Sequence, residues 1–149
     1  MRFVIQRVES ASVTVDNGAV SSIQTGFVVL CGYRKEDDPA RIPRMVEKCL
    51  NLRVFEDNRG KMNLSIMDVV GELLVVSQFT LYADCRHGRR PGFDLAMPPS
   101  DAEQMFQKTV EEFRHSGLKT VSGIFAAKMK ITLINNGPVT IILDDQELF

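Results

Sequence analysis

The chain of 149 residues is long enough to form one domain with a substantial core, so we expect a single domain over residues 1–149. Hydrophobic residues make up 44% and charged residues 25%, which excludes a disordered or fibrous chain. The net charge is −1, whereas proteins that grip a long stretch of nucleic acid usually carry a basic excess. We therefore expect no DNA partner and contact with a short piece of RNA at most.

The sequence shows no sign of a membrane span, a signal peptide or a metal site. No apolar run approaches the length of a membrane helix, and the first residues lack a signal-peptide core, so we expect a cytoplasmic protein with no membrane association. Cys31, Cys49 and Cys85 are odd in number and form no Cys-x-x-Cys pair, which predicts reduced thiols. His87 and His115 do not complete a metal-ligand spacing with them, so we expect no metal and no cofactor.

The first third of the chain is typical of β-structure. Residues 3–8 and 11–15 are rich in Val and Ile, and Asp16-Asn17-Gly18 predicts a tight turn after them. The continuous apolar run 27–31 predicts a strand that is covered on both faces.

A first helix is predicted next, with Asp38 as its cap and Pro39 at its first position. Its buried stripe is formed by Ile42, Met45, Val46, Cys49 and Leu50. Residues 52–55 then predict a strand, residues 57–60 a turn, and residues 72–79 another strong strand.

A long loop, 84–99, precedes the second helix, and loops of this length inside a compact domain tend to carry function. Ser100 and Glu103 predict a capping box at the start of that helix, and Gly117 predicts its end. The buried stripe consists of Ala102, Met105, Phe106, Val110 and Phe113.

Two strands, 130–135 and 139–143, finish the chain and are joined by a turn at 136–138. Hairpin-type turns outnumber helical crossovers along the chain. The fold class is therefore predicted to be α/β, with a mixed, largely antiparallel sheet packed against two main helices.

Two candidate sites lie in the long loop. Cys85 and His87 offer a thiol and a base, but in cysteine hydrolases these partners usually come from distant segments, which favours an incidental thiol. The basic run Arg86-His87-Gly88-Arg89-Arg90, reinforced by Arg7, Arg53 and Lys61, is the best candidate for a local RNA-binding patch. The alternative is a solvated loop.

Two further segments place unusual groups at the ends of strands. Ser77-Gln78-Phe79-Thr80-Leu81 brings two hydroxyls and an amide to the exit of an apolar strand, but no Gly-x-Ser-x-Gly elbow surrounds Ser77, so a serine triad is poorly supported. In Asn135–Thr140, Gly137 has no side chain and Pro138 no N–H, which leaves a rigid pair of carbonyl oxygens. The simpler interpretations are a satisfied strand end and a plain hairpin turn.

Taken together, these two segments resemble the paired signature of the D-aminoacyl-tRNA deacylase family. The resemblance spans nearly the whole chain. Its other pieces are Gln6-Arg7-Val8, residues 51–55, residues 60–63, residues 88–91, and Gly123-Ile124-Phe125 leading to Met129. Members of the family usually have a glycine where this chain has Ala126, so we expect Ala126 to tighten the pocket if that position needs a positive φ.

The resemblance implies a deacylase-type fold with a barrel-like sheet in the dimer, and hydrolysis of the ester bond of D-aminoacyl-tRNA without a covalent nucleophile or a cofactor. Activity on glycyl-tRNA mischarged on tRNA-Ala stays open. By the same resemblance, Ser77, Gln78, Phe79 and Thr80 would be the catalytic segment and would shape an oxyanion hole.

The resemblance also implies a homodimer that binds the acceptor end of tRNA in active sites at the subunit interface. The Gly137-Pro138 peptide would be cis, would reach into the partner subunit's site, and would hold the substrate's α-ammonium with its carbonyl oxygens while excluding an L side chain. Arg7 would pack against this motif, and Phe125 and Met129 would border the adenine pocket. The competing interpretations are a non-catalytic RNA-binding module on the same fold, an editing domain for L-amino acids, and a thiol hydrolase based on Cys85.

Overall fold

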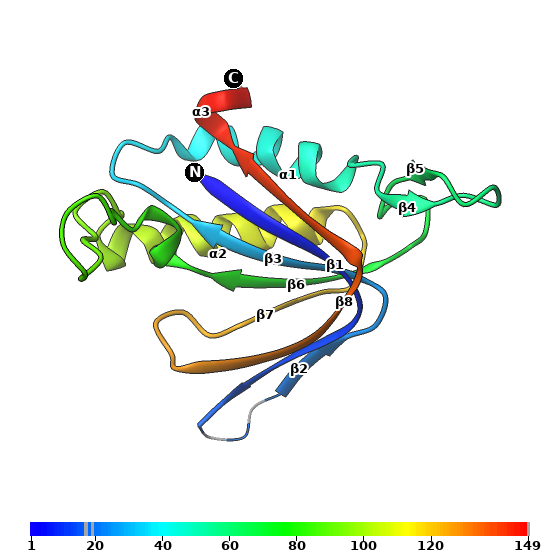
Figure 1. Cartoon of the computed structure of the whole chain (residues 1–149), viewed down its shortest axis with the longest axis horizontal. Coiled ribbons are helices and arrows are strands. Elements are labelled where there is room, and N and C mark those ends of the chain that lie inside the picture. Colours follow the sequence, from blue (N-terminus) through cyan, green and yellow to red (C-terminus); the bar gives the residue numbers. More distant parts are fainter. Residues whose placement is uncertain (17, 19, 149) are drawn as a thin grey trace.

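The computed structural model describes residues 1–16, 18 and 20–148. The chain forms a strongly curved sheet with two main helices on one face (Figure 1). The strands are β1 (Arg2–Val15), β2 (Val20–Ile23), β3 (Gly26–Gly32), β4 (Phe55–Glu56), β5 (Met62–Leu64), β6 (Glu72–Ser77), β7 (Thr120–Ser122) and β8 (Met129–Asp144). The helices are α1 (Ile42–Leu50), α2 (Pro99–His115) and α3 (Asp145–Leu148), with 3-10 turns η1 (Pro39–Arg41) and η2 (Phe79–Tyr82).

The sheet is mixed, as predicted. Its order is β2-β1-β3-β6-β7, and β8 pairs with β1. The pairs that β1 makes with β2, β3 and β8 are antiparallel, whereas β3, β6 and β7 are parallel to one another. Parallel neighbours need a long crossover, and α1 and α2 lie in those two connections. The predicted α/β class is therefore confirmed.

Apolar side chains cover both faces of the central strands. The stripes of α1 and α2 pack on one face of the sheet, against residues that include Phe3, Phe27 and Leu73. The alternate residues, such as Val28 and Leu74, pack into a second cluster that the curved ends of β1, β2 and β8 complete. The prediction that residues 27–31 form a strand covered on both faces is thus confirmed, because side chains alternate between the two clusters.

The last two predicted strands form one strand instead. β8 runs from Met129 to Asp144, and both of its halves pair with β1 rather than with each other. The register changes between the pairs Gln6↔Thr140 and Val8↔Asn135, so residues 136–139 bulge out opposite Arg7. The prediction of a hairpin was wrong because a bulge, like a turn, accommodates Gly and Pro inside a long strand. Similarly, residues 3–8 and 11–15 belong to the single strand β1.

Other boundaries also differ from the sequence-based predictions. Of residues 52–55 only Phe55 is in a strand, and β6 ends at Ser77, so Phe79 lies in η2 and not in the strand. The capping box was wrong: α2 begins at Pro99 with Pro98 as its N-cap and has no side-chain cap, because proline at the first positions removes a donor that would need one.

The predicted cap at Asp38 and the predicted turn at residues 16–18 agree with the structure. Asp38 accepts a hydrogen bond from the Ala40 N–H at 2.8 Å, so it caps η1, which leads into α1. Gly18 N donates to Val15 O at the predicted turn, of which Asn17 lies outside the described residues. None of the described helices is long and apolar enough to cross a membrane.

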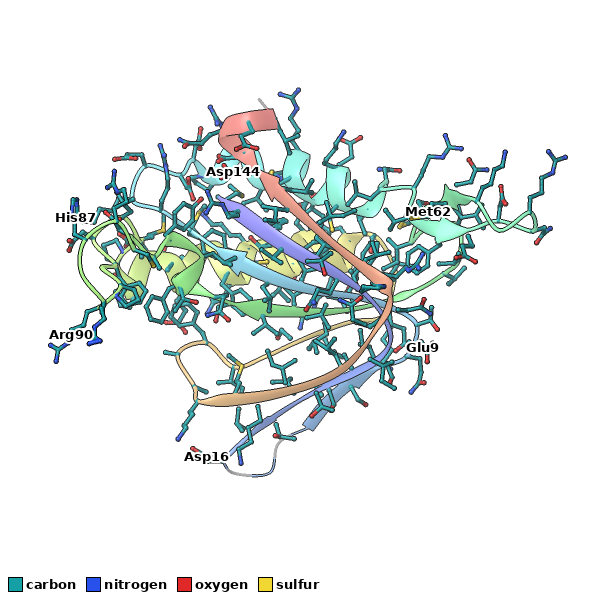
Figure 2. The ribbon with its side chains drawn as sticks, in the orientation of Figure 1. Glu9, Asp16, Met62, His87, Arg90 and Asp144 are labelled. Atoms are coloured by element: carbon teal, nitrogen blue, oxygen red, sulfur yellow. The ribbon has the colours of Figure 1, made fainter. Side chains whose placement is uncertain are left out.

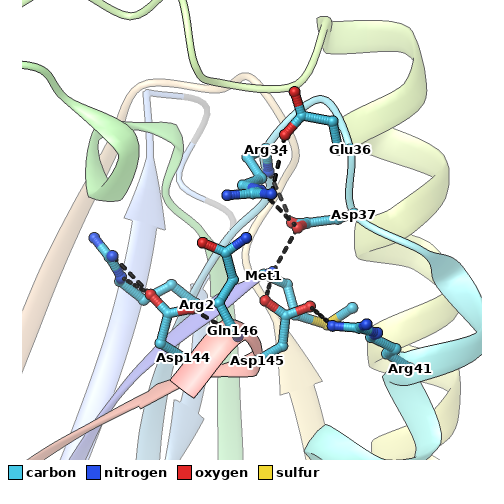
Figure 3. A network of polar contacts seen from close by, with 9 residues as sticks. All are labelled: Met1, Arg2, Arg34, Glu36, Asp37, Arg41, Asp144, Asp145 and Gln146. Atoms are coloured by element: carbon cyan, nitrogen blue, oxygen red, sulfur yellow. Dashed lines mark hydrogen bonds and ion pairs between the residues drawn. The ribbon is translucent and has the colours of Figure 1, made fainter. Parts of the chain in front are cut away.

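Ion pairs fasten the two chain ends together (Figure 3). The buried amine of Met1 lies 2.7 Å from Asp37 Oδ1 and 2.6 Å from Asp145 Oδ1. Arg2 donates to Asp144 Oδ2 from Nε at 2.9 Å and from Nη2 at 2.7 Å. Its Nη1 donates to the carbonyl oxygen of Leu81, also at 2.9 Å, so Arg2 ties η2 to β1 and β8.

Candidate active site

A cavity of about 710 Å³ opens at the carboxyl end of β6. The charged residues in its lining are Lys35 and Asp94, and most of the remainder are apolar. Five of the predicted site residues line it together: Ser77, Gln78, Phe79, Phe125 and Met129. The cavity is therefore the natural place for a ligand that is largely apolar with a few polar groups.

The end of β6 turns sharply into η2 at the edge of this cavity. Gln78 N donates to Cys31 O at 2.7 Å, which is the last bond to β3 before the chain turns. The side chain of Gln78 then donates from Nε2 to Thr80 Oγ1 at 2.5 Å. Thr80 itself does not line the cavity, but this contact brings it to the rim beside Gln78.

Two backbone N–H groups in η2 are free. The first N–H groups of a helical turn have no partner within the turn. Among the described residues, no acceptor is found for the N–H of Phe79 or Thr80, whereas Leu81 N donates to Gln78 O. Two adjacent unpaired donors therefore lie next to the cavity and can bind an oxygen atom.

Aromatic residues form much of the cavity's apolar wall. The rings of Phe79 and Phe93 meet edge to face with their centroids 4.9 Å apart. The ring centroids of Phe125 and of Phe106 in α2 lie 6.2 Å apart. Met129, the first residue of β8, also lines the cavity. Ala126 also lines the cavity and has φ of +56°, so the position does need a positive φ, which alanine adopts with some strain.

None of the described residues that line the cavity is a convincing nucleophile. Burial, reinforced by the neighbouring Cys49, raises the pKa of the Cys31 thiol well above its ordinary value, so the thiol stays protonated. His87 and His115 lie outside the lining, so Ser77 has no histidine there to act as a base. Cys85 is exposed and also lies outside the lining. Within the described residues, no group of three His, Cys, Asp or Glu is placed to hold a metal ion.

The side chain of Arg7 supports the bulge at Gly137 and Pro138 through hydrogen bonds. Its buried guanidinium donates from Nη1 to Val54 O, from Nε to Asn136 O at 3.1 Å, and from Nη2 to Asn136 Oδ1 at 3.3 Å. The Gly137-Pro138 peptide bond is cis, as the resemblance implies. Gly137 has φ of +123°, and a Cβ there would lie 2.8 Å from Arg7 Nη2. Both Gly137 and Pro138 are exposed.

The predicted site residues thus fall into two groups that are far apart in one chain. The bulge lies opposite Arg7, which pairs with Phe27 of β3, whereas Ser77 pairs with Cys31. These two positions on β3 are four residues apart, which is about 13 Å along the strand. Figure 1 shows the bend of β8 and the arrowhead of β6 at opposite ends of the sheet.

The predicted basic patch is not continuous. Arg7 is buried beneath the bulge, so including it in a surface patch was wrong. Arg53 donates to Asn63 O at 2.7 Å and lies, like Lys61, at the β4–β5 hairpin, which Met62 marks in Figure 2. His87 and Arg90 lie at the opposite end of the molecule in the same view. Of the described positions in the predicted patch, those at 86–90 form one continuous exposed segment.

Several lining residues were missed from the sequence. Phe93 follows the basic segment inside the long loop, where its apolar side chain was a signal that the loop folds back onto the protein. Ile131 could have been found because it follows Met129 with the two-residue period of a strand. Tyr33 and Ala102 gave no such signal, because they look like ordinary core residues.

A family model described as D-Tyr-tRNA(Tyr) deacylase matches residues 4–144. The chain is 47% identical to a D-aminoacyl-tRNA deacylase of Thermosipho africanus, 50% identical to one of Clostridioides difficile and 52% identical to one of Clostridium perfringens, each over all 149 residues and 100% of both chains.

Solved structures show the same fold. The structure of a c-Myc DNA unwinding element binding protein is similar with a TM-score of 0.90 and 44% identity, covering 97% of this chain and 99% of that one. A structure described as a probable eukaryotic D-amino acid tRNA deacylase has a TM-score of 0.84 over 95% of this chain and 97% of that one. Its identity of 14% makes it a likeness of fold alone.

Proposed function

The chain belongs to the D-Tyr-tRNA(Tyr) deacylase family, and on that premise we infer that it hydrolyses the ester bond of D-aminoacyl-tRNA. The products are the free D-amino acid and the uncharged tRNA. The observation that carries this conclusion is the match to curated D-aminoacyl-tRNA deacylases over the entire chain. The enzyme is a carboxylic ester hydrolase in which residues 1–149 act as one domain, and its place of action is the cytoplasm, where charged tRNA is used.

The free N–H groups of Phe79 and Thr80 form the oxyanion hole. Water adds to the ester carbonyl and the carbonyl oxygen takes the negative charge. The bond from the carbonyl carbon to the ribose oxygen then breaks, and the proton that the attacking water gives up passes to that ribose oxygen. Two unpaired donors at the cavity edge favour this assignment because they need not break an existing hydrogen bond to bind the developing charge. An aminoacyl ester is already activated, so positioning and charge stabilisation suffice, with assistance from the adenosine 2′-hydroxyl.

The cavity holds the terminal adenosine, with Phe125 and Met129 against the adenine. Its apolar, aromatic lining suits a flat base, and its polar side at Ser77, Gln78 and Phe79 suits the ester. The strained φ of Ala126 supports a narrow wall at this point, since a glycine would leave more space.

The Gly137-Pro138 bulge acts as the chirality filter in a second copy of the chain. Its carbonyl oxygens bind the substrate's α-ammonium and leave no space for an L side chain, while a D side chain points toward solvent. Two observations support a homodimer with shared sites: the bulge is exposed and rigidly held by Arg7, and it lies too far along the sheet to serve its own cavity. Arg7 is therefore a positioning residue.

The decisive experiment compares mirror-image substrates. We expect the purified protein to deacylate D-Tyr-tRNA much faster than L-Tyr-tRNA without added metal, because the filter excludes the L side chain by lack of space. The measurement is the initial rate of release of radiolabelled tyrosine from each substrate. Equal rates would reject the filter. Preference for the L substrate would favour an editing domain for L-amino acids, and no turnover of either would favour a non-catalytic nucleic-acid-binding module.

The thiol hydrolase is tested separately. Cys85→Ala is expected to keep kcat within about twofold of the wild-type value, because the exposed thiol lies outside the cavity lining and surface substitutions of this kind change little. Steady-state kinetics on D-Tyr-tRNA give the answer. Loss of turnover in this variant would make Cys85 the nucleophile and overturn the backbone mechanism.

A further inference from the structure

The loop formed by residues 86–91, called the basic loop from here on, protrudes beside the cavity. Two backbone hydrogen bonds of 2.8 Å, from Asp84 N to Gly92 O and from Gly92 N to Asp84 O, close its base. Every residue from 86 to 91 is exposed, and Figure 2 shows His87 and Arg90 at the edge of the molecule, with the Arg90 side chain directed away from it. The basic loop is therefore a defined projection with arginines on its surface.

One of its three arginines is neutralised within the protein. Arg86 donates from Nε to Asp84 Oδ1 at 2.9 Å and from Nη2 to Asp84 Oδ2 at 2.6 Å. These hydrogen bonds lower the pKa of Asp84 to about 2, so the carboxylate stays charged at any working pH. Arg86 is thus held against Asp84 and helps to shape the base of the loop.

Arg89 and Arg90, unlike Arg86, are not paired with a carboxylate among the described residues. Within the described part of the chain, neither has a carboxylate or a hydrogen-bond acceptor in contact. Two exposed guanidinium groups on adjacent residues, without an internal partner, form a site with a charge of +2 in a protein whose net charge is −1. The guanidinium group suits the paired oxygens of a phosphate.

The basic loop is anchored to the cavity. Phe93, the residue after its base, lines the cavity and packs against Phe79 with ring centroids 4.9 Å apart. The returning segment is held by Met97 N, which donates to Tyr33 O at 3.0 Å. Arg90 precedes Phe93 by three residues, which spans at most about 10 Å of chain. If a ligand occupies the cavity, the parts of it that extend out of the cavity therefore lie within reach of Arg89 and Arg90.

We propose that Arg89 and Arg90 bind the phosphodiester backbone of the single-stranded acceptor end of tRNA, directly outside the cavity that takes the terminal adenosine. This inference rests on the proposed function. The ligand class is RNA. The terminal nucleotide of the tRNA would enter the cavity at the end where the basic loop is anchored, and the phosphates that precede this nucleotide are the anions nearest to the loop. The contacts are to the backbone, so they act on tRNAs of any sequence.

The test uses Arg89→Gln/Arg90→Gln in the full-length protein. We expect KM for D-Tyr-tRNA to rise about tenfold while kcat stays within about twofold, because phosphate contacts contribute to binding and not to the chemical step. The slope of log KM against log salt concentration is expected to fall by about 1.4, since each phosphate contact on a single strand contributes about 0.7. On 3′-O-D-tyrosyl-adenosine, which has no phosphate, the variant and the wild type are expected to show the same KM.

The matched control is Lys48→Gln/Lys108→Gln, which removes the same charge from exposed positions on α1 and α2. An equal rise of KM in this control, an unchanged KM in the arginine variant, or the same loss on the phosphate-free substrate would overturn the proposal. Failure of the wild type on both substrates would instead reject the proposed function, and this inference with it.

Discussion

Phe79→Pro is expected to have a kcat about 100- to 1,000-fold below that of Phe79→Ala, because proline has no N–H to donate to the developing oxyanion. Both variants lose the ring that lines the cavity and contacts Phe93. Their difference therefore isolates one backbone donor. In free energy it amounts to about 3–4 kcal/mol of transition-state stabilisation.

The structure shows that proline fits at this position. Phe79 is the first residue of η2, where proline is favoured, and its N–H makes no hydrogen bond with the described residues. The preceding Gln78 has φ of −145° and ψ of 85°, outside the helical region that a following proline disfavours. Phe79 is also 57% exposed, so its replacement leaves the core intact.

The measurement is single-turnover hydrolysis of D-Tyr-tRNA at saturating enzyme, with the melting temperature of each variant as a check of folding. If Phe79→Pro and Phe79→Ala hydrolyse the ester at equal rates while both remain folded, the N–H of Phe79 is not part of the oxyanion hole.

Gly137→Ala is expected to lower kcat/KM for D-Tyr-tRNA by at least about tenfold and to reduce the preference for the D substrate. The new Cβ would lie 2.8 Å from Arg7 Nη2 and from Val139 Cγ2, so the bulge or the guanidinium must move. A φ of +123° adds backbone strain for alanine, and residues in such regions cost about 1–3 kcal/mol each. A displaced bulge presents its carbonyl oxygens in the wrong place and leaves space for an L side chain.

The control for Gly137→Ala is Gly60→Ala on the β4–β5 hairpin. Gly60 also has a positive φ, +71°, but a Cβ there would meet nothing within 4 Å. Both variants thus bear backbone strain, and only one is crowded against Arg7. Rates on D- and L-Tyr-tRNA are compared for the two. Equal D-to-L ratios in both would show that the position of the bulge does not govern chirality.

Local patterns predicted the helices and the central strands well. The stripes of α1 and α2 are buried as predicted, because a period of 3.6 residues against a sheet leaves little choice. The start of α2 was mispredicted, since Ser100 and Glu103 match a capping box while Pro98 and Pro99 already begin the helix. Local signals of similar strength competed there, and proline's fixed φ determined the outcome.

The candidate site was less accessible to prediction. Motif residues such as Ser77 and Phe125 could be named from the resemblance, but their meeting in one cavity depends on tertiary contacts between the end of β6 and the segment before β8, which local patterns do not encode. Gly-Pro is compatible with a hairpin turn as well as with a bulge, and only the pairing of both halves of β8 with β1 distinguishes the two. The free N–H groups of η2 had no sequence signal at all.

The placement of Gly137 and Pro138 within β8, rather than at the tip of a hairpin, sets a limit on evolutionary change. At a tip, residues can be inserted or deleted without disturbing the flanking strands. Here, losing one residue between Asn135 and Thr140 would either shorten the bulge and displace its carbonyl groups, or shift the last part of the strand by one position and turn Leu143, now buried, toward the opposite face. The length of this segment is thus constrained by the folding of the strand as well as by the chemistry of its carbonyl groups.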